Sequence, residues 1–210
     1  MPKINYSADY RLQLRERILN TASSNFRQRG IKAVKMDDIA NSLSISKRTL
    51  YEIFHTKEDL LYECVKTYHE NFMTKLREAV SNGKNVIEII AEIYKLQMKE
   101  SSLSSPIFYA ELSKYPQVDT YFRRHYEERK SRSVDFLMKG VEDGYFRPDI
   151  NYDIVNRIAN ANTEYVMRTK LYNQYPLYVI FWNVQLLLVR GMCTEKGLKI
   201  LDEQLGGIDH

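Results

Sequence analysis

Cysteine is scarce in this sequence, and the histidines are few. Its 210 residues include two cysteines, Cys64 and Cys193, which lie far apart along the chain. Neither a disulfide framework nor a thiolate metal site is therefore expected. The four histidines show no metal-ligand spacing either: they are His55, His69, His125 and His210. The sequence predicts a protein that carries no metal and no other cofactor.

Long apolar runs are also missing. A bilayer span needs roughly 20 apolar residues, whereas the longest candidate here, Leu177 to Val189, is interrupted by Asn183 and Gln185. The first residues lack the apolar region of a signal peptide. No nucleophile elbow, phosphate-binding P-loop or glycine-rich dinucleotide loop occurs. We therefore expect a cytoplasmic protein that does not contact a membrane and is not an enzyme.

Glycine and proline are sparse, with 8 and 5 residues. Apolar residues recur at spacings of three and four almost throughout, which predicts an all-α protein of about nine helices. The predicted helices are Asp9–Arg29, Met36–Leu43, Lys47–His55, Thr56–Val80, Val86–Glu100, Ile107–Lys114, Val118–Gly140, Tyr152–Tyr172 and Pro176–Met192, with a tail helix at Glu195–Leu205. Residues 81–85 break the pattern and are the predicted hinge.

Positive charge is concentrated at one end of the chain. Residues 1–60 contain 11 Lys and Arg against 7 Asp and Glu, whereas residues 61–210 contain 20 of each kind. A localised basic excess favours a module that faces a polyanion, attached to a neutral body. An excess of four charges is also compatible with an ordinary solvated face, so the charge distribution alone does not distinguish the two.

Residues 36–55 have the pattern of a helix-turn-helix. Two helices of about two turns each are separated by three residues, and the second helix of such a motif can lie in a DNA major groove. One face of this second helix is apolar, with Leu50, Ile53 and Phe54, and is suited to pack on the first helix. The opposite face is polar and carries Arg48, Glu52 and His55.

The order of charges in the second helix is unusual. Ser46 is a good N-cap, but Lys47 and Arg48 follow it, and cations at a helix N-terminus oppose the macrodipole by roughly 0.3–1 kcal/mol each. No acidic residue occurs in that helix before Glu52, so nothing local is expected to offset this cost. A phosphate or a guanine edge would offset it; an exposed basic turn without function is the alternative.

The segment MDDIANSLSISKRTLYEIFHTKEDL, residues 36–60, resembles the DNA-binding signature of TetR-family regulators. The preceding Phe26-x-x-x-Gly30 and the C-terminal phrase from Arg190 to Gly197 resemble family features too. The match covers about residues 10–75. It implies an all-α homodimer with an N-terminal three-helix DNA-binding domain and a C-terminal helical domain, which represses transcription until a small molecule releases it from its operator.

The resemblance also implies which residues contact double-stranded DNA. Three residues would reach base edges: Lys47, Arg48 and Thr49. Three others would touch phosphates: Tyr51, His55 and Lys57. Arg48 is suited to read a guanine, because its forked guanidinium group matches the O6 and N7 acceptors of that base.

Two positions depart from the family pattern. Lys35 replaces the Ser or Thr that usually caps the first helix of the motif. Lysine cannot cap, so that helix start must rely on Asp37, Asp38 or water, although Lys35 is still expected to reach phosphate. Ser44 replaces the usual turn glycine, and would be strained if that position requires a positive φ.

The C-terminal part resembles the family in layout. The helix Pro176–Met192 is apolar around most of its circumference, which predicts two buried faces and hence a dimer contact; burial inside one chain is the alternative. The residues that we assign to the dimer interface are Phe181, Trp182, Gln185 and Leu188. A small hydrophobic or aromatic effector is predicted to bind among aromatic side chains, although such residues could equally be plain core: Tyr94, Met98, Phe108, Tyr109, Tyr126, Phe136 and Tyr165.

These observations predict three parts of the chain. Residues 1–56 form the DNA-binding domain, 57–82 the connecting helix and hinge, and 83–210 the effector-binding and dimerisation domain. A regulator of the same fold that answers to a protein partner or activates transcription is the alternative. An all-helical binding protein or enzyme with an incidental basic end is a more remote one.

Overall fold

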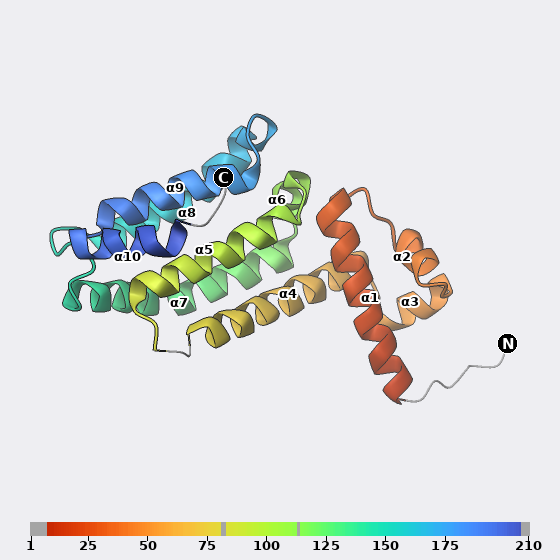
Figure 1. Cartoon of the computed structure of the whole chain (residues 1–210). Helices are drawn as coiled ribbons and strands as arrows, with labels where there is room; N and C mark the ends of the chain where they lie inside the picture. Colours follow the sequence, from red (N-terminus) through yellow and green to blue (C-terminus); the bar gives the residue numbers. More distant parts are fainter. Residues whose placement is uncertain (1–7, 81–82, 113, 207–210) are drawn as a thin grey trace. The chain divides into compact units, whose positions relative to one another are not determined.

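The computed structural model describes residues 8–80, 83–112 and 114–206. They form ten α-helices and one 3₁₀ helix, so the predicted all-α class is confirmed (Figure 1). The helices are α1 (Ala8–Arg29), α2 (Met36–Ser42), α3 (Lys47–Ile53), α4 (Lys57–Val80), α5 (Val86–Ser102), α6 (Pro106–Leu112), α7 (Pro116–Glu142), α8 (Tyr152–Thr169), η1 (Leu171–Asn173), α9 (Leu177–Met192) and α10 (Glu195–Leu205).

The predicted helix ends agree with these bounds to within two residues, except at the end of α8. That helix was predicted to reach Tyr172 but ends at Thr169, because Lys170 adopts a left-handed conformation with φ 55° and a 3₁₀ turn follows. Of the predicted hinge, residues 81 and 82 lie outside the described part. Asn85 caps α5 by accepting hydrogen bonds from the backbone N–H groups of Ile87 and Glu88.

The chain divides into two compact units. The first, which we call the head, comprises the described residues up to Asn71 together with Ile107–Asp119; the second, the body, comprises Phe72–Pro106 and the described residues from Thr120 onwards. The helices α4 and α7 each contribute to both units. The segment Ile107–Asp119, which the sequence analysis assigned to the C-terminal domain, therefore groups with the head.

The core of the head is built on α1. Five apolar residues of α1 form a buried stripe, and the buried side chains of the head also include Leu50 of α3, its C-cap Phe54, and Leu60 and Leu61 of α4. Burial of such side chains contributes about 1.5–3 kcal/mol each. The α1 stripe consists of Leu14, Ile18, Leu19, Ala22 and Phe26.

The helix α6 belongs to the head because it packs closely on the end of α1. Gly30 follows α1 with φ 84°, and a Cβ atom at this position would lie 2.8 Å from Cγ2 of Ile107. Glu111 of α6 is only 9% exposed, and its Oε2 accepts a hydrogen bond of 2.8 Å from the backbone N–H of Lys32. A glycine is therefore needed at position 30 for its backbone conformation and for this close approach.

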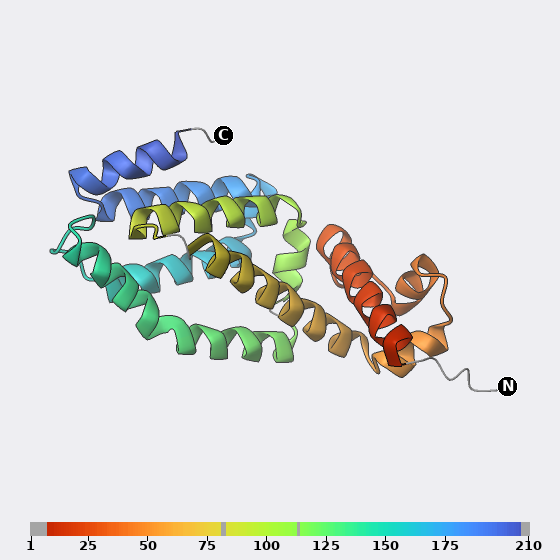
Figure 2. The ribbon, with the colours of Figure 1, turned by 60° about the horizontal axis from the view of Figure 1, so that its bottom comes forward.

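In the body, α5 packs against both α9 and α10, and the three helices lie side by side in Figures 1 and 2. The core between them includes Ile87, Trp182, Leu201 and the buried ring of Tyr94. The Tyr94 hydroxyl donates to the backbone carbonyl of Gln185 at 3.2 Å, and burial of this side chain raises its pKa.

The two cysteines are free and buried. Burial raises the pKa of the Cys64 thiol to about 12 and that of Cys193 to about 11, so both are protonated at neutral pH. In the described part of the chain, His, Cys, Asp and Glu do not form a group that could hold a metal ion. None of the described helices is long and apolar enough to span a membrane.

Candidate nucleic-acid interface

The turn between α2 and α3 contains a strained residue. Ser44 has φ 53°, in the left-handed region, so this position does require the conformation that glycine adopts most easily. Two backbone hydrogen bonds hold the turn: Ser44 N–H donates to the Asn41 carbonyl at 3.1 Å and Ile45 N–H to the Ala40 carbonyl at 3.0 Å. These two hydrogen bonds hold the turn in a conformation that is unfavourable for serine.

The first turn of α3 is fixed by its cap. Ser46 is the N-cap, as predicted, and its hydroxyl accepts a hydrogen bond of 3.0 Å from the Thr49 N–H. The Ser46 and Thr49 hydroxyls are also hydrogen-bonded to each other at 2.8 Å. Leu50, fully buried, anchors the other side of the helix. A short helix of two turns is thus held in one orientation at both faces.

Lys47 is paired with an acidic residue of the preceding helix. Its Nζ lies 2.8 Å from Oδ1 of Asp37 in α2. This hydrogen bond and the charge of Asp37 raise the Lys47 pKa. The expectation that nothing local offsets the cations at the start of α3 is therefore wrong, since Asp37 lies ten residues back in sequence but beside Lys47 in space.

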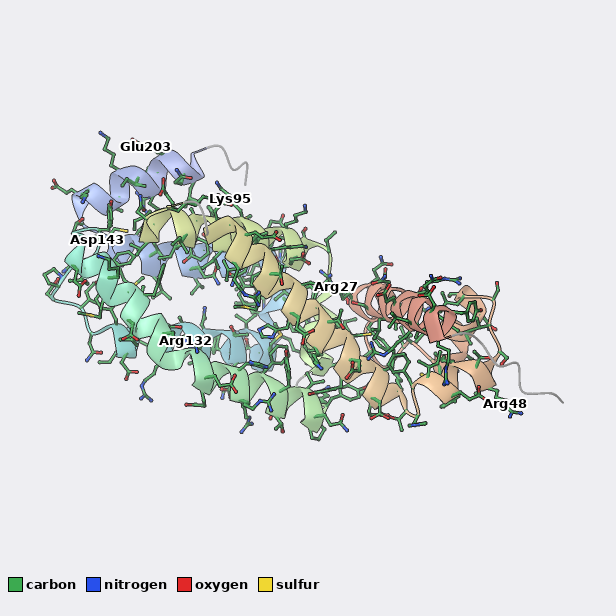
Figure 3. All side chains as sticks on the ribbon, turned by 90° about the horizontal axis from the view of Figure 1, so that it is seen from below. Arg27, Arg48, Lys95, Arg132, Asp143 and Glu203 are labelled. Carbon is green, nitrogen blue, oxygen red and sulfur yellow. The ribbon has the colours of Figure 1, made fainter. Side chains whose placement is uncertain are left out.

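Arg48 is paired within its own helix. Its Nε donates to Oε1 of Glu52, one turn further along, at 3.0 Å. The Arg48 side chain is 73% exposed, and Figure 3 shows it extending away from the ribbon of α3. An exposed pair of this kind contributes about 0.3–0.5 kcal/mol, so its contribution to the stability of α3 is small.

The start of α2 uses the substitute cap that the sequence analysis named. Lys35 is the N-cap residue, and its backbone N–H donates to Oδ2 of Asp38 at 3.1 Å while its carbonyl accepts from the Asp38 N–H. Asp38 also lies 3.5 Å from Nη2 of Arg29. The Lys35 side chain is exposed and does not cap α2.

The three predicted phosphate contacts differ in exposure. Tyr51 is 38% exposed and His55 is exposed, whereas Lys57, at the start of α4, is half-buried. Partial burial lowers the pKa of the Lys57 ammonium, although the charges of Glu58 and Glu111 act in the opposite direction. A phosphate at this site would favour the charged form that burial disfavours.

All seven residues predicted to contact DNA therefore lie in the head: four on α3, His55 and Lys57 shortly after it, and Lys35 at the N-cap of α2. Sequence reasoning missed the two acidic partners, Asp37 and Glu52, that lie against Lys47 and Arg48. The spacing of four between Arg48 and Glu52 was a usable signal for that pair. The Asp37 contact had no such signal, because it depends on how α2 and α3 cross.

The residues predicted to line an effector pocket are distributed over both units. Tyr94 is buried in the body, and Met98 and Phe136 pack partly buried against the same core. Phe108 and Tyr109 lie on α6 in the head, with ring centroids 5.4 Å apart in an edge-to-face arrangement. Tyr165 is 52% exposed on α8, and the side chain of Tyr126 lies outside the described residues.

The residues predicted to form the dimer interface are mostly covered within the chain. Trp182 is only 7% exposed and belongs to the body core, while Phe181, Gln185 and Leu188 are half-buried. Other apolar side chains on α8 and α9 are exposed, and Leu187 of α9, at 74%, is the most exposed of them. On α8 they follow a helical spacing: Ile154, Ile158 and Tyr165.

This geometry defines a class of protein. A capped two-turn helix, anchored by Leu50 and presenting Lys47 and Arg48, follows a tight turn and a first supporting helix. These are the parts of a helix-turn-helix DNA-binding domain, in which the second helix lies in the major groove and contacts the base edges.

Comparison with known proteins identifies the family. Residues 18–64 match the family described as bacterial regulatory proteins, tetR family. The transcriptional repressor KstR2 of Mycolicibacterium smegmatis is 30% identical over 155 residues, which are 71% of this chain and 75% of that protein. The chain therefore belongs to the TetR family and is a DNA-binding transcriptional repressor.

Solved structures share the fold. The ketosteroid transcriptional regulator KstR2 of Mycobacterium tuberculosis has a TM-score of 0.60 at 22% identity, covering 92% of this chain and 98% of that one. A transcriptional regulator of Saccharomonospora viridis, solved with choline, has a TM-score of 0.66 at 18% identity, covering 93% and 97%. At such identities the likeness extends to the architecture alone.

Proposed function

We propose that this repressor binds a roughly palindromic operator as a homodimer, with one α3 helix of each protomer in each of two successive major grooves. The two recognition helices would then lie about 34–36 Å apart. The observation that carries the proposal is the exposed cationic start of α3, where Lys47 and Arg48 follow a fixed N-cap on a helix anchored by Leu50.

Within this interface we assign Lys47, Arg48 and Thr49 to base edges. A rigid backbone anchor favours this, because Ser46 fixes the first turn of α3. When DNA arrives, Lys47 must give up part of its contact with the Asp37 carboxylate, so binding exchanges one ion pair for another. The remaining contacts go to phosphates: Lys35, Tyr51, His55 and Lys57.

The dimer contact that we propose lies on the exposed apolar side chains of α8 and α9. Ile154, Ile158 and Tyr165 form a stripe on α8, and Leu187 is the most exposed apolar side chain of α9. Contiguous apolar surface of this kind is typical of protein interfaces. The half-buried Phe181, Gln185 and Leu188 would border this face, whereas Trp182 supports it from within the core.

We further propose that a small hydrophobic or aromatic molecule releases the repressor from its operator. The ketosteroid regulator and the choline-bound regulator that share this fold support an organic effector. The effector would favour a dimer whose two heads no longer match the operator spacing, and α4 is one of the two helices, with α7, that contribute to both the head and the body. Effector and DNA must then weaken each other's binding by the same factor. Because its target is genomic DNA, we expect the protein to act in the cytoplasm.

Selection of bound fragments from random duplex DNA tests the proposal. The purified protein is incubated with the DNA at near-physiological salt, and bound fragments are sequenced after several rounds. We expect an enriched inverted repeat with half-sites one helical turn apart or a multiple of it. Enrichment of a single half-site would contradict the dimeric reader, and no enrichment from a folded protein would contradict sequence-specific binding.

Once the operator is known, the effector coupling is tested by titration. Candidate small apolar and aromatic compounds are added to the repressor–operator complex, and fluorescence anisotropy of a labelled operator reports release. A compound that releases the operator must itself bind more weakly to the repressor when operator is present, by an equal factor. A bound compound that leaves operator affinity unchanged at saturation would show that it is not the effector.

A further inference from the structure

Glu52 is an acidic side chain on the surface of the recognition helix, where a polyanion is to bind. It is 54% exposed and lies one helical turn from Arg48. On its own, a carboxylate at this position repels phosphates and lowers affinity for every DNA sequence alike. Its presence therefore calls for a second effect that offsets this repulsion.

The contact between the two side chains supplies that effect. Glu52 accepts from Nε of Arg48 through Oε1 at 3.0 Å. The hydrogen bond engages the inner nitrogen of the guanidinium group and leaves both terminal nitrogens, Nη1 and Nη2, directed beyond it. Those two nitrogens can donate together to O6 and N7 of a guanine, the commonest specific contact between an arginine and DNA.

We propose that Glu52 is a positioning residue for base recognition: it holds the guanidinium plane of Arg48 so that both terminal N–H groups meet one guanine. The proposal rests on the function proposed above. Glu52 then has two opposite effects. Its carboxylate weakens binding to every DNA sequence, but it increases the preference for one base.

The second ion pair of this surface offers a matched comparison. Asp37 lies against Lys47, again as an exposed acid beside an exposed cation. A lysine ammonium is a point charge without a planar fork, so fixing its direction adds little to base discrimination. Removal of Asp37 should therefore show the charge effect alone, and removal of Glu52 should show the charge effect together with the loss of positioning.

The experiment measures the affinity of the dimeric full-length protein for its selected operator, for each single-base-pair variant of that operator and for an unrelated duplex. The variants are Glu52→Ala, Glu52→Gln, Asp37→Asn and Arg48→Ala. Circular dichroism and thermal melting establish that each is folded. Arg48→Ala identifies the base pair that Arg48 reads, as the position where its preference is lost.

We expect Glu52→Ala to bind the unrelated duplex more tightly than wild type while its guanine preference at that base pair falls about tenfold. Glu52→Gln should also bind the unrelated duplex more tightly but keep most of the preference, because the amide oxygen still accepts from Nε. Asp37→Asn should bind all duplexes more tightly and keep the preference in full.

The proposal is overturned if Glu52→Ala raises the affinity for the operator and for its variants by one common factor, since Glu52 would then act through its charge alone. It is also overturned if Glu52→Gln loses as much preference as Glu52→Ala. A wild-type protein that prefers no sequence would instead contradict the proposed function, so the two failures are distinguishable.

Discussion

The head and the body of this repressor present opposite kinds of surface. Around α3 the head exposes cations that are paired with acidic neighbours, Lys47 with Asp37 and Arg48 with Glu52. On α8 and α9 the body exposes apolar side chains, led by Leu187. DNA recognition requires particular atoms at fixed positions, whereas an apolar contact requires area and shape. A family pattern therefore identifies the residues of the head one by one, but identifies only the layout of the body.

The largest effect is expected from a charge on the apolar face of the body. Leu187→Arg should convert the dimer to a monomer and weaken operator binding about 10²–10⁴-fold, because each half-site then binds without the gain from its neighbour. Sedimentation and operator titration measure the two effects. Met138→Arg, at an exposed apolar residue of α7, is the control; an equal loss there would mean that the face on α8 and α9 is not special.

In the head, Arg48→Ala and Lys57→Ala should differ in kind. Arg48→Ala is expected to weaken operator binding about 5- to 150-fold and to relax the preference at one base pair. Lys57→Ala should weaken binding to all sequences alike and lower the slope of log affinity against log salt by about one. Titrations of operator and random duplex at several salt concentrations separate them, and identical behaviour of both variants would contradict the role of Arg48 in reading a base.

The packing of α6 on the head predicts an effect on stability. Glu111→Ala removes the buried acceptor of the Lys32 backbone N–H and should cost about 1–3 kcal/mol of the free energy of unfolding. Glu111→Gln keeps an acceptor oxygen and should recover most of this loss. Urea denaturation measures both variants, and an equal loss in the two would indicate that the charge of Glu111, not its hydrogen bond, holds α6 in place.

The smallest effect is expected at the turn of the helix-turn-helix. Ser44→Gly should raise the free energy of unfolding by about 1 kcal/mol, since glycine adopts the positive φ of this position without the clash of a side chain. Ser42→Gly, at the end of α2, should instead lower it by roughly 0.5–1 kcal/mol. Thermal melting distinguishes the two variants. Destabilisation by both would show that the Ser44 side chain stabilises the fold by more than its backbone strain destabilises it.

Sequence patterns were most informative where interactions are local. The bounds of α1 and the Ser46 cap follow from helical spacing and from backbone preferences, and both are confirmed. The strain at Ser44 follows in the same way, once a turn is placed there. These features are encoded within a few residues of where they act.

Contacts between segments that are distant in sequence could not be predicted from local patterns. The pairing of Asp37 with Lys47 depends on the crossing of two helices, and the docking of Glu111 on Lys32 joins residues 79 positions apart. The two faces of an apolar helix are also indistinguishable in sequence, and Trp182, which was assigned to the dimer interface, belongs to the core of the body within this chain. Likewise Tyr165, expected near an effector, is exposed on α8.

A hydroxyl-radical footprint of the repressor on its selected operator tests the central claim most directly. At saturation, two head domains held by one body dimer should protect two patches on one face of the duplex. The patches should be related by the twofold axis of the dimer, with centres about 34–36 Å apart. Both patches should fade together as protein is diluted. A single protected patch at saturation, or two patches that fade independently, would contradict a dimeric reader whose spacing is set by the body.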